Sequence, residues 1–149
     1  MTDTQNIVVE EVLPHAPGVI WTALTTGELM GRWLMPASGF EAVKGNRFTF
    51  TTRPAGAWDG TIQCEILEIE PQSRLVYSWT SGHPDNVGYG ATLDTVVSWT
   101  LEPAGAGTRV KMIHAGFVVP RNELALQNMG EGWRKIVPRL GEVVVGGAA

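Results

Sequence analysis

The sequence that decides the fold runs from residue 107 to residue 140 and reads GTRVKMIHAGFVVPRNELALQNMGEGWRKIVPRL. Its first part predicts a turn followed by one β-strand, because Val110, Met112 and His114 alternate with Arg109 and Lys111. A strand with one apolar and one polar face is typical of an antiparallel sheet that is covered on one side only.

The second part of this stretch predicts a helix. Apolar residues recur at three- and four-residue steps over roughly 25 residues and form a single stripe: Leu126, Met129, Trp133, Ile136 or Val137, Leu140 and Val144. At about 1.5 Å per residue, such a helix would cross a whole sheet. Pro138 has no backbone N–H and crowds the carbonyl of Arg134, so we expect a kink there.

Four earlier segments also show the two-residue period of strands. Their inward positions are Phe48 and Phe50; Ile62, Cys64 and Ile66; Leu75, Tyr77 and Trp79; and Val97, Trp99 and Leu101. After Ile66 the apolar phase passes to Leu67 and Ile69, which predicts a β-bulge. Residues 81–91 form the longest expected loop, which would either border the mouth of a pocket or have no function.

The N-terminal part predicts one strand over residues 7–13 and then two short helices. Pro17 suits the first turn of a helix, and Thr25 or Thr26 can cap a second helix that carries Trp33. The predicted fold class is therefore α+β. A curved antiparallel sheet, with two short helices after the first strand, wraps around a long C-terminal helix and leaves an internal cavity.

Composition excludes several classes of function. The chain has 149 residues, 44% of them hydrophobic and 17% charged, which suits one soluble globular domain over residues 1–149. A net charge of −4 gives no basic surface for nucleic acid, and the longest apolar runs are too short to cross a membrane. The only cysteine, Cys64, favours a reducing compartment, so we expect a cytoplasmic protein. The histidines His15, His83 and His114 lie far apart without a metal-ligand spacing, so we expect no metal, and we expect no cofactor either.

These features resemble the AHSA family, named for activators of the ATPase of the 90-kDa heat-shock protein, within the START-like (SRPBCC, Bet v-type) helix-grip superfamily. The resemblance extends from about residue 7 to residue 145. Gly45-Asn46 replaces the family's usual glycine pair, and Pro138 interrupts the helix. The matching pieces are Ala16-Pro17, residues 19–25, Trp33, Lys44-Gly45-Asn46-Arg47-Phe48, Gly60, residues 75–79, Gly107-Thr108-Arg109-Val110, His114-Ala115-Gly116-Phe117, Gly132-Trp133 and Leu140.

The resemblance implies a cup-shaped domain. It also implies a binding function, since superfamily relatives bind lipids, steroids, hormones or polyketides, and a few are cyclases. We therefore expect a hydrophobic or aromatic small molecule in the cavity. The residues expected to line it are Trp33, Phe48, Phe50, Ile62, Cys64, Tyr77, Trp79, Val97, Trp99, Met112, His114, Met129 and Trp133. Among them, Trp33, Trp99 and Trp133 are expected to form an aromatic wall.

Two residues are weak catalytic candidates. His114 could act as a general base, although a histidine satisfied by hydrogen bonds is the favoured interpretation, and Tyr77 could orient a ligand or simply pack. Cys64 is expected to be a small buried hydrophobe. Arg32 could pair with a ligand carboxylate, but a solvated cation is favoured. Asp59 and Glu65 are the acids closest to the expected cavity, and Glu65 should point outward.

Three functions remain open at this point. The preferred one is a binding module for an apolar small molecule. The first alternative is a cavity-based acid–base enzyme (a cyclase, dehydratase or hydrolase) that uses His114 or Tyr77. The second alternative is a stress-related or chaperone-interacting domain, for which chaperone-ATPase stimulation is disfavoured. The exposed edges of the sheet also allow a homodimer.

Overall fold

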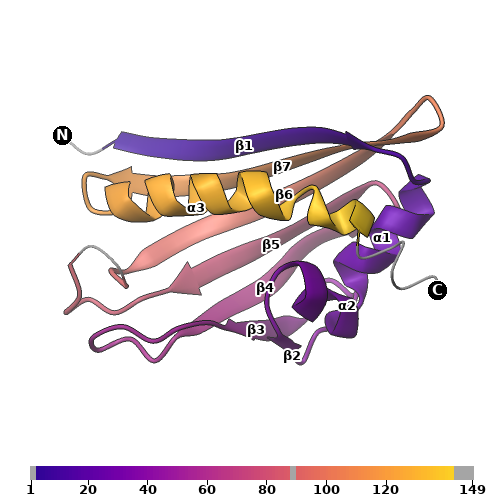
Figure 1. Cartoon of the computed structure of the whole chain (residues 1–149). Helices are drawn as coiled ribbons and strands as arrows, with labels where there is room; N and C mark the ends of the chain where they lie inside the picture. The colour runs from indigo at the N-terminus through magenta and orange to yellow at the C-terminus, as the bar shows by residue number, and fades with distance from the viewer. Residues whose placement is uncertain (1–2, 88–89, 143–149) are drawn as a thin grey trace.

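Seven strands form one curved antiparallel sheet in the computed structural model, which describes residues 3–87 and 90–142 (Figure 1). Two short helices follow the first strand, and a longer helix follows the last. The strands are β1 (Asp3–Leu13), β2 (Ala37–Ser38), β3 (Arg47–Thr51), β4 (Thr61–Glu70), β5 (Arg74–Ser81), β6 (Leu93–Ala104) and β7 (Gly107–Val119). The helices are α1 (Pro17–Thr25), α2 (Gly27–Trp33) and α3 (Glu123–Ile136). The predicted α+β helix-grip class is confirmed.

The first and last strands are neighbours, since the strand order is β1-β7-β6-β5-β4-β3-β2. Every neighbouring pair is antiparallel, as the two-residue period predicted. His114 on β7 lies opposite Ile7 of β1 and opposite Val97 of β6. The strand that carries His114 is therefore enclosed on both sides, and its apolar face is fully buried at Val110 and Met112.

The predicted bulge in β4 is present, but Leu67 does not face the core. The pairing between β4 and β5 shifts between Ile66 and Glu68, which makes Leu67 the extra residue. Its side chain is 37% exposed, whereas Ile69 packs against the core. The prediction that Leu67 continues the inner face is wrong, because the extra residue of a bulge is left out of the pairing.

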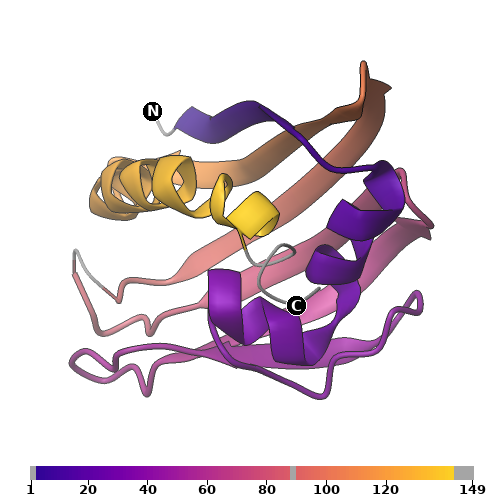
Figure 2. The same ribbon diagram turned by 45° about the vertical axis from the view of Figure 1, so that its right-hand side comes forward.

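All three helices cover the same face of the sheet, which we call the inner face (Figure 2). The helix α3 runs alongside β1 and β7, while α1 and α2 lie at one end of the sheet (Figure 1). The loop of residues 52–60 and the loop residues 82–87 and 90–92 lie toward the opposite end (Figure 1). The expected pair of short helices after the first strand is confirmed.

The helix α3 is shorter than the sequence predicted. It spans 14 residues and is capped at Val137, and residues 139–142 form a separate helical turn. Pro138 has no N–H to donate to the carbonyl of Arg134, so the helix is broken at the expected position and not merely kinked. Val144, the last residue of the predicted stripe, lies outside the described residues.

Large aromatic side chains fill the core between α3, the short helices and the inner face. Trp33, Phe50, Tyr77 and Trp99 have no exposed surface at all. Burial of apolar surface at about 25 cal/mol per Å² makes this aromatic layer the main stabilising contact between helices and sheet. Within the described ranges, no helix has both the length and the hydropathy needed to cross a membrane.

Candidate functional site

A cavity of about 190 Å³ lies between the first half of α3 and the inner face of the sheet. Strands β4, β5 and β6 form its floor through Ile62, Trp79 and Leu93. The remaining described residues of the lining come from the end of β5, from α3 and from the surrounding loops: Ser81, Ala125, Asn128, Met129, Met35, Thr52, Trp58, Gly90 and Ala91. None of these described side chains is ionisable, so the walls are apolar with a few neutral polar groups.

One side chain joins the two loops at the mouth of the cavity. The Asn86 Nδ2 donates to the carbonyl of Ala55 at 2.7 Å, and the Ala57 N–H donates to the Asn86 Oδ1 at 3.1 Å. A second amide, Asn122, donates to the carbonyl of Thr92 at 2.9 Å and thereby ties the start of α3 to the start of β6. The Asn86 contacts therefore join the two loops to each other, and the Asn122 contact joins the start of α3 to the segment before β6.

Trp58 is held over the cavity by the turn that contains Gly60. Its indole N–H donates to the carbonyl of Thr61 at 2.9 Å. Gly60 has a φ of 87°, and a Cβ there would collide with the carbonyl oxygen of Thr52. Only glycine fits such a backbone without strain, so this position determines how the loop presents Trp58.

The structure brings three of the predicted lining residues to this cavity, namely Ile62, Trp79 and Met129. The other predicted residues are packed in the core beside it: Trp33, Phe48, Phe50, Cys64, Tyr77, Val97, Trp99, Met112, His114 and Trp133. The three expected wall residues do touch one another. The Trp99 ring lies 5.5 Å from the Trp33 ring and 5.7 Å from the Trp133 ring, both in edge-on contacts.

His114 is fully buried and takes part in a directed chain of hydrogen bonds. The Trp133 Nε1–H donates to the His114 Nδ1 at 3.0 Å, and because indole is a donor only, this nitrogen is unprotonated. The proton is therefore on Nε2, which donates to the Thr95 Oγ1 at 2.7 Å. That hydroxyl donates in turn to the carbonyl of Trp79 at 2.9 Å. Burial lowers the pKa of His114 to about 3, so the imidazole is neutral.

This arrangement leaves neither catalytic candidate free to exchange a proton with a ligand. Both ring nitrogens of His114 are engaged inside the protein. The Tyr77 hydroxyl accepts from the Trp99 Nε1–H at 3.1 Å, and burial raises the tyrosine pKa well above its usual range. Burial also raises the pKa of the Cys64 thiol to about 12, in keeping with its expected role as a small hydrophobe.

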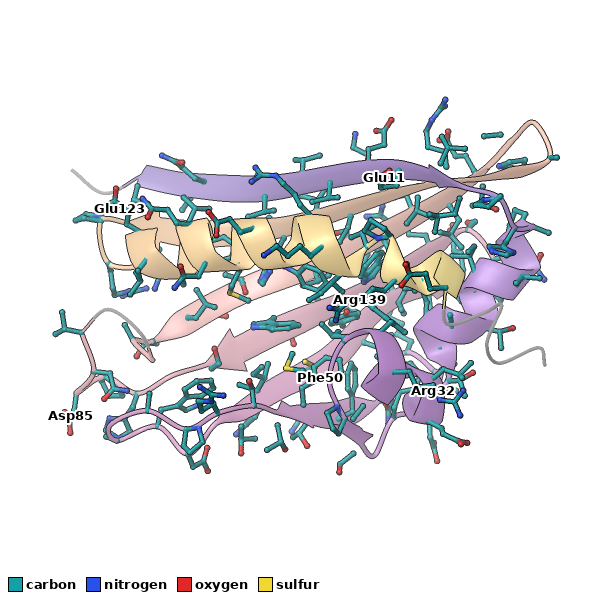
Figure 3. All side chains as sticks on the ribbon, in the orientation of Figure 1. Glu11, Arg32, Phe50, Asp85, Glu123 and Arg139 are labelled. Carbon is teal, nitrogen blue, oxygen red and sulfur yellow. The ribbon has the colours of Figure 1, made fainter. Side chains whose placement is uncertain are left out.

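The charged candidates lie away from the cavity. Arg32 lies in the last turn of α2, at the opposite end of the molecule from Asp85 and its loop, and it is exposed (Figure 3). Glu65 forms a surface ion pair with Arg47 at 3.3 Å. Asp59 is exposed and accepts a hydrogen bond from the Thr61 N–H at 2.9 Å, which lowers the pKa of the carboxyl group.

Sequence reasoning missed Trp58, Met35, Leu93 and Asn128. Trp58 and Met35 belong to irregular segments without a period, so no pattern assigns them a direction. Asn128 directly precedes Met129 of the helical stripe and borders the cavity rather than facing the core. A high tryptophan content was the available signal, since a large aromatic in a loop needs a surface to cover.

A curved antiparallel sheet that packs around one long C-terminal helix defines the helix-grip class of domains. The chain belongs to the family described as activator of Hsp90 ATPase homolog 1-like proteins, whose model matches residues 14–144. The expected family is thus confirmed. No curated protein sequence matches the chain.

Several solved structures share this fold. Protein MLL2253 from Mesorhizobium loti is 31% identical, with a TM-score of 0.81 over 94% of this chain and 96% of that one. The Aha1 dimer from Colwellia psychrerythraea is 18% identical, with a TM-score of 0.72 over 94% of this chain and 96% of that one. CalU16 from Micromonospora echinospora is 22% identical, with a TM-score of 0.70 over 97% of this chain and 86% of that one.

Proposed function

We propose that this protein binds a small, uncharged, mainly apolar molecule in the cavity under α3. The observation that supports this function is a cavity of about 190 Å³ whose described walls are apolar and carry no ionisable side chain. An engineered cavity of about 150 Å³ that is lined by apolar side chains alone holds one benzene molecule. The volume therefore suits a single ring with one or two substituents, and a steroid or a lipid chain would need more space.

Acid–base catalysis is less well supported than binding. A catalytic acid or base must reach the reacting group, directly or through one water molecule. The two candidates, His114 and Tyr77, are buried and already hydrogen-bonded to other side chains. The polar groups in the described lining are hydroxyls and amides of ordinary reactivity, which suit recognition of a ligand.

A screen of ring-sized and chain-shaped ligands tests the proposal. Ring-sized aromatic compounds should raise the melting temperature of the protein and perturb the NMR signals of the Met129 and Leu93 methyl groups. Long-chain fatty acids and steroids should do neither. A screen in which only the large ligands bind would contradict the proposal, because they cannot enter a cavity of this size.

A filled-cavity variant provides a second test. Ala125 lines the cavity from α3, so Ala125→Phe should occupy the space and weaken binding of ring-sized ligands at least tenfold. The matched control is Ala42→Phe, because Ala42 lies exposed in the loop before β3 and does not border the cavity. Equal affinities in these two variants would place the binding site elsewhere.

A further inference from the structure

One buried indole N–H beside the cavity has no partner among the described residues. Five tryptophans are buried, and four of them donate their indole N–H to another group of the protein. The exception is Trp79, which is only 2% exposed and whose N–H makes no hydrogen bond with any described residue. A buried tryptophan N–H normally finds an acceptor, so this exception calls for a physical cause.

The open space next to Trp79 supplies that cause. Across the described chain, no side-chain nitrogen or oxygen that is shut off from solvent lacks a partner. The Trp79 Nε1 has no partner among the described residues, so we infer that it borders open space, and the space that this side chain lines is the cavity. The rest of the Trp79 ring is fixed, with the rings of Phe50, His114 and Trp133 at 5.6, 5.1 and 5.8 Å. The donor therefore points at the cavity from a rigid position.

We propose that the ligand of this cavity carries a hydrogen-bond acceptor, such as a carbonyl or ether oxygen, that binds the Trp79 indole N–H. This inference rests on the proposed function and specifies the chemical class of its ligand. Indole is a donor only, so the ligand must provide the acceptor. The acceptor is uncharged, because no described residue of the lining carries a positive charge to compensate an anion.

The remaining polar groups of the lining can bind a second polar substituent of the ligand. Thr52, Ser81 and Asn128 border the cavity, and their side chains make no hydrogen bonds with the described residues. They can donate to or accept from a second polar substituent, while Trp58, Met35 and Leu93 enclose the ring itself. A neutral aromatic ketone, aldehyde, ester or ether of one ring has this combination of features.

A matched pair of probes tests the assignment. Acetophenone and α-methylstyrene have nearly the same shape and differ in carrying an oxygen or a methylene group at the acceptor position. In the wild-type protein, acetophenone should move the Trp79 indole N–H signal downfield in an NMR titration, and α-methylstyrene should not. Equal movement of this signal with both probes would overturn the inference.

Variants separate the hydrogen bond from the shape of the cavity. Trp79→Phe, or 3-benzothienylalanine at position 79, should change the ratio of the two dissociation constants by about three- to tenfold in favour of α-methylstyrene. The control is Trp58→Phe, because the Trp58 N–H is already donated to Thr61. This variant should weaken both probes alike and leave the ratio unchanged.

The outcomes distinguish this inference from the function on which it rests. If neither probe binds the wild-type protein, the proposed function fails and the inference fails with it. If both bind but replacement of Trp79 leaves their ratio unchanged, the binding function stands and the acceptor assignment is wrong. Should Trp79→Phe fail to fold, the wild-type NMR titration decides the question by itself.

Discussion

The interior around His114 and the interior around Trp58 and Trp79 are built from the same residue types. They differ in how completely side chains fill the space and pair the polar groups. Around His114, aromatic rings touch one another, and the indole N–H groups of Trp99 and Trp133 and both ring nitrogens of His114 have hydrogen-bond partners. Around Trp58 and Trp79, a similar set of apolar residues leaves a cavity of about 190 Å³. The comparison indicates that the end around His114 supplies rigidity and the end around Trp79 supplies space.

The largest expected effect is a difference in the free energy of unfolding when one tryptophan from each region is truncated to alanine. Trp133→Ala should lower the free energy of unfolding by about 4 kcal/mol, because it creates a large cavity and leaves the His114 Nδ1 without its donor. Trp58→Ala should cost clearly less, since Trp58 already borders open space. Urea unfolding of both variants measures the difference. Equal losses would show that the two ends are equally well packed.

Acidification should reduce the contribution of His114 to the free energy of unfolding. The pKa of His114 is lowered from 6.5 to about 3 in the folded protein, so its stabilising contribution is complete above pH 6.5. As the pH falls toward 3, the unfolded chain binds a proton that the folded protein does not. The free energy of unfolding should then fall by up to about 1.4 kcal/mol per pH unit.

The variant His114→Gln removes this proton linkage. Urea unfolding between pH 7 and pH 4 should give a shallower decline for the variant than for the wild-type protein. Only the slopes are compared, since the variant also loses packing. Parallel curves would mean that His114 is protonated in the folded protein as readily as in the unfolded chain.

Removal of single hydroxyl groups should produce the smallest changes in the free energy of unfolding, and the change should be larger near His114 than at the cavity. Thr95→Val removes both the acceptor of the His114 Nε2–H and the donor to the Trp79 carbonyl, so we expect a loss of about 1–3 kcal/mol. Thr52→Val at the cavity removes a hydroxyl that makes no hydrogen bond with the described residues, and its effect should stay within about 0.5 kcal/mol. Thermal or urea unfolding of the two variants measures both losses. Similar losses would show that the two hydroxyl groups contribute equally to stability.

Much of the fold was predictable because strands and helices leave their periods in the sequence. Alternation at Val110, Met112 and His114 correctly predicted which face of β7 is buried. The bulge after Ile66 was also found, although the outward direction of Leu67 was not. Periodicity reports which face is covered, but it does not report the local backbone geometry that turns a single extra residue outward.

The candidate site was less predictable. The pattern placed Ile62, Trp79 and Met129 on inward faces, and these three do line the cavity. It also placed Trp99 and Met112 inward, and they lie in the solid part of the core. An inward direction is common to both groups, so the sequence alone contains no signal that separates a side chain facing a cavity from one that is fully packed.

The sequence by itself determined the fold class, the order of the strands along the chain and the position at which Pro138 interrupts the last helix, because these depend on local periods and on a missing backbone donor. Only the tertiary structure decided where the interior stays open. That depends on how residues distant in the chain meet, as when Asn86 joins the loop of Ala55, or when Trp133 and Thr95 enclose His114. Such contacts leave no period in the sequence, since packing density is a property of the whole assembled interior.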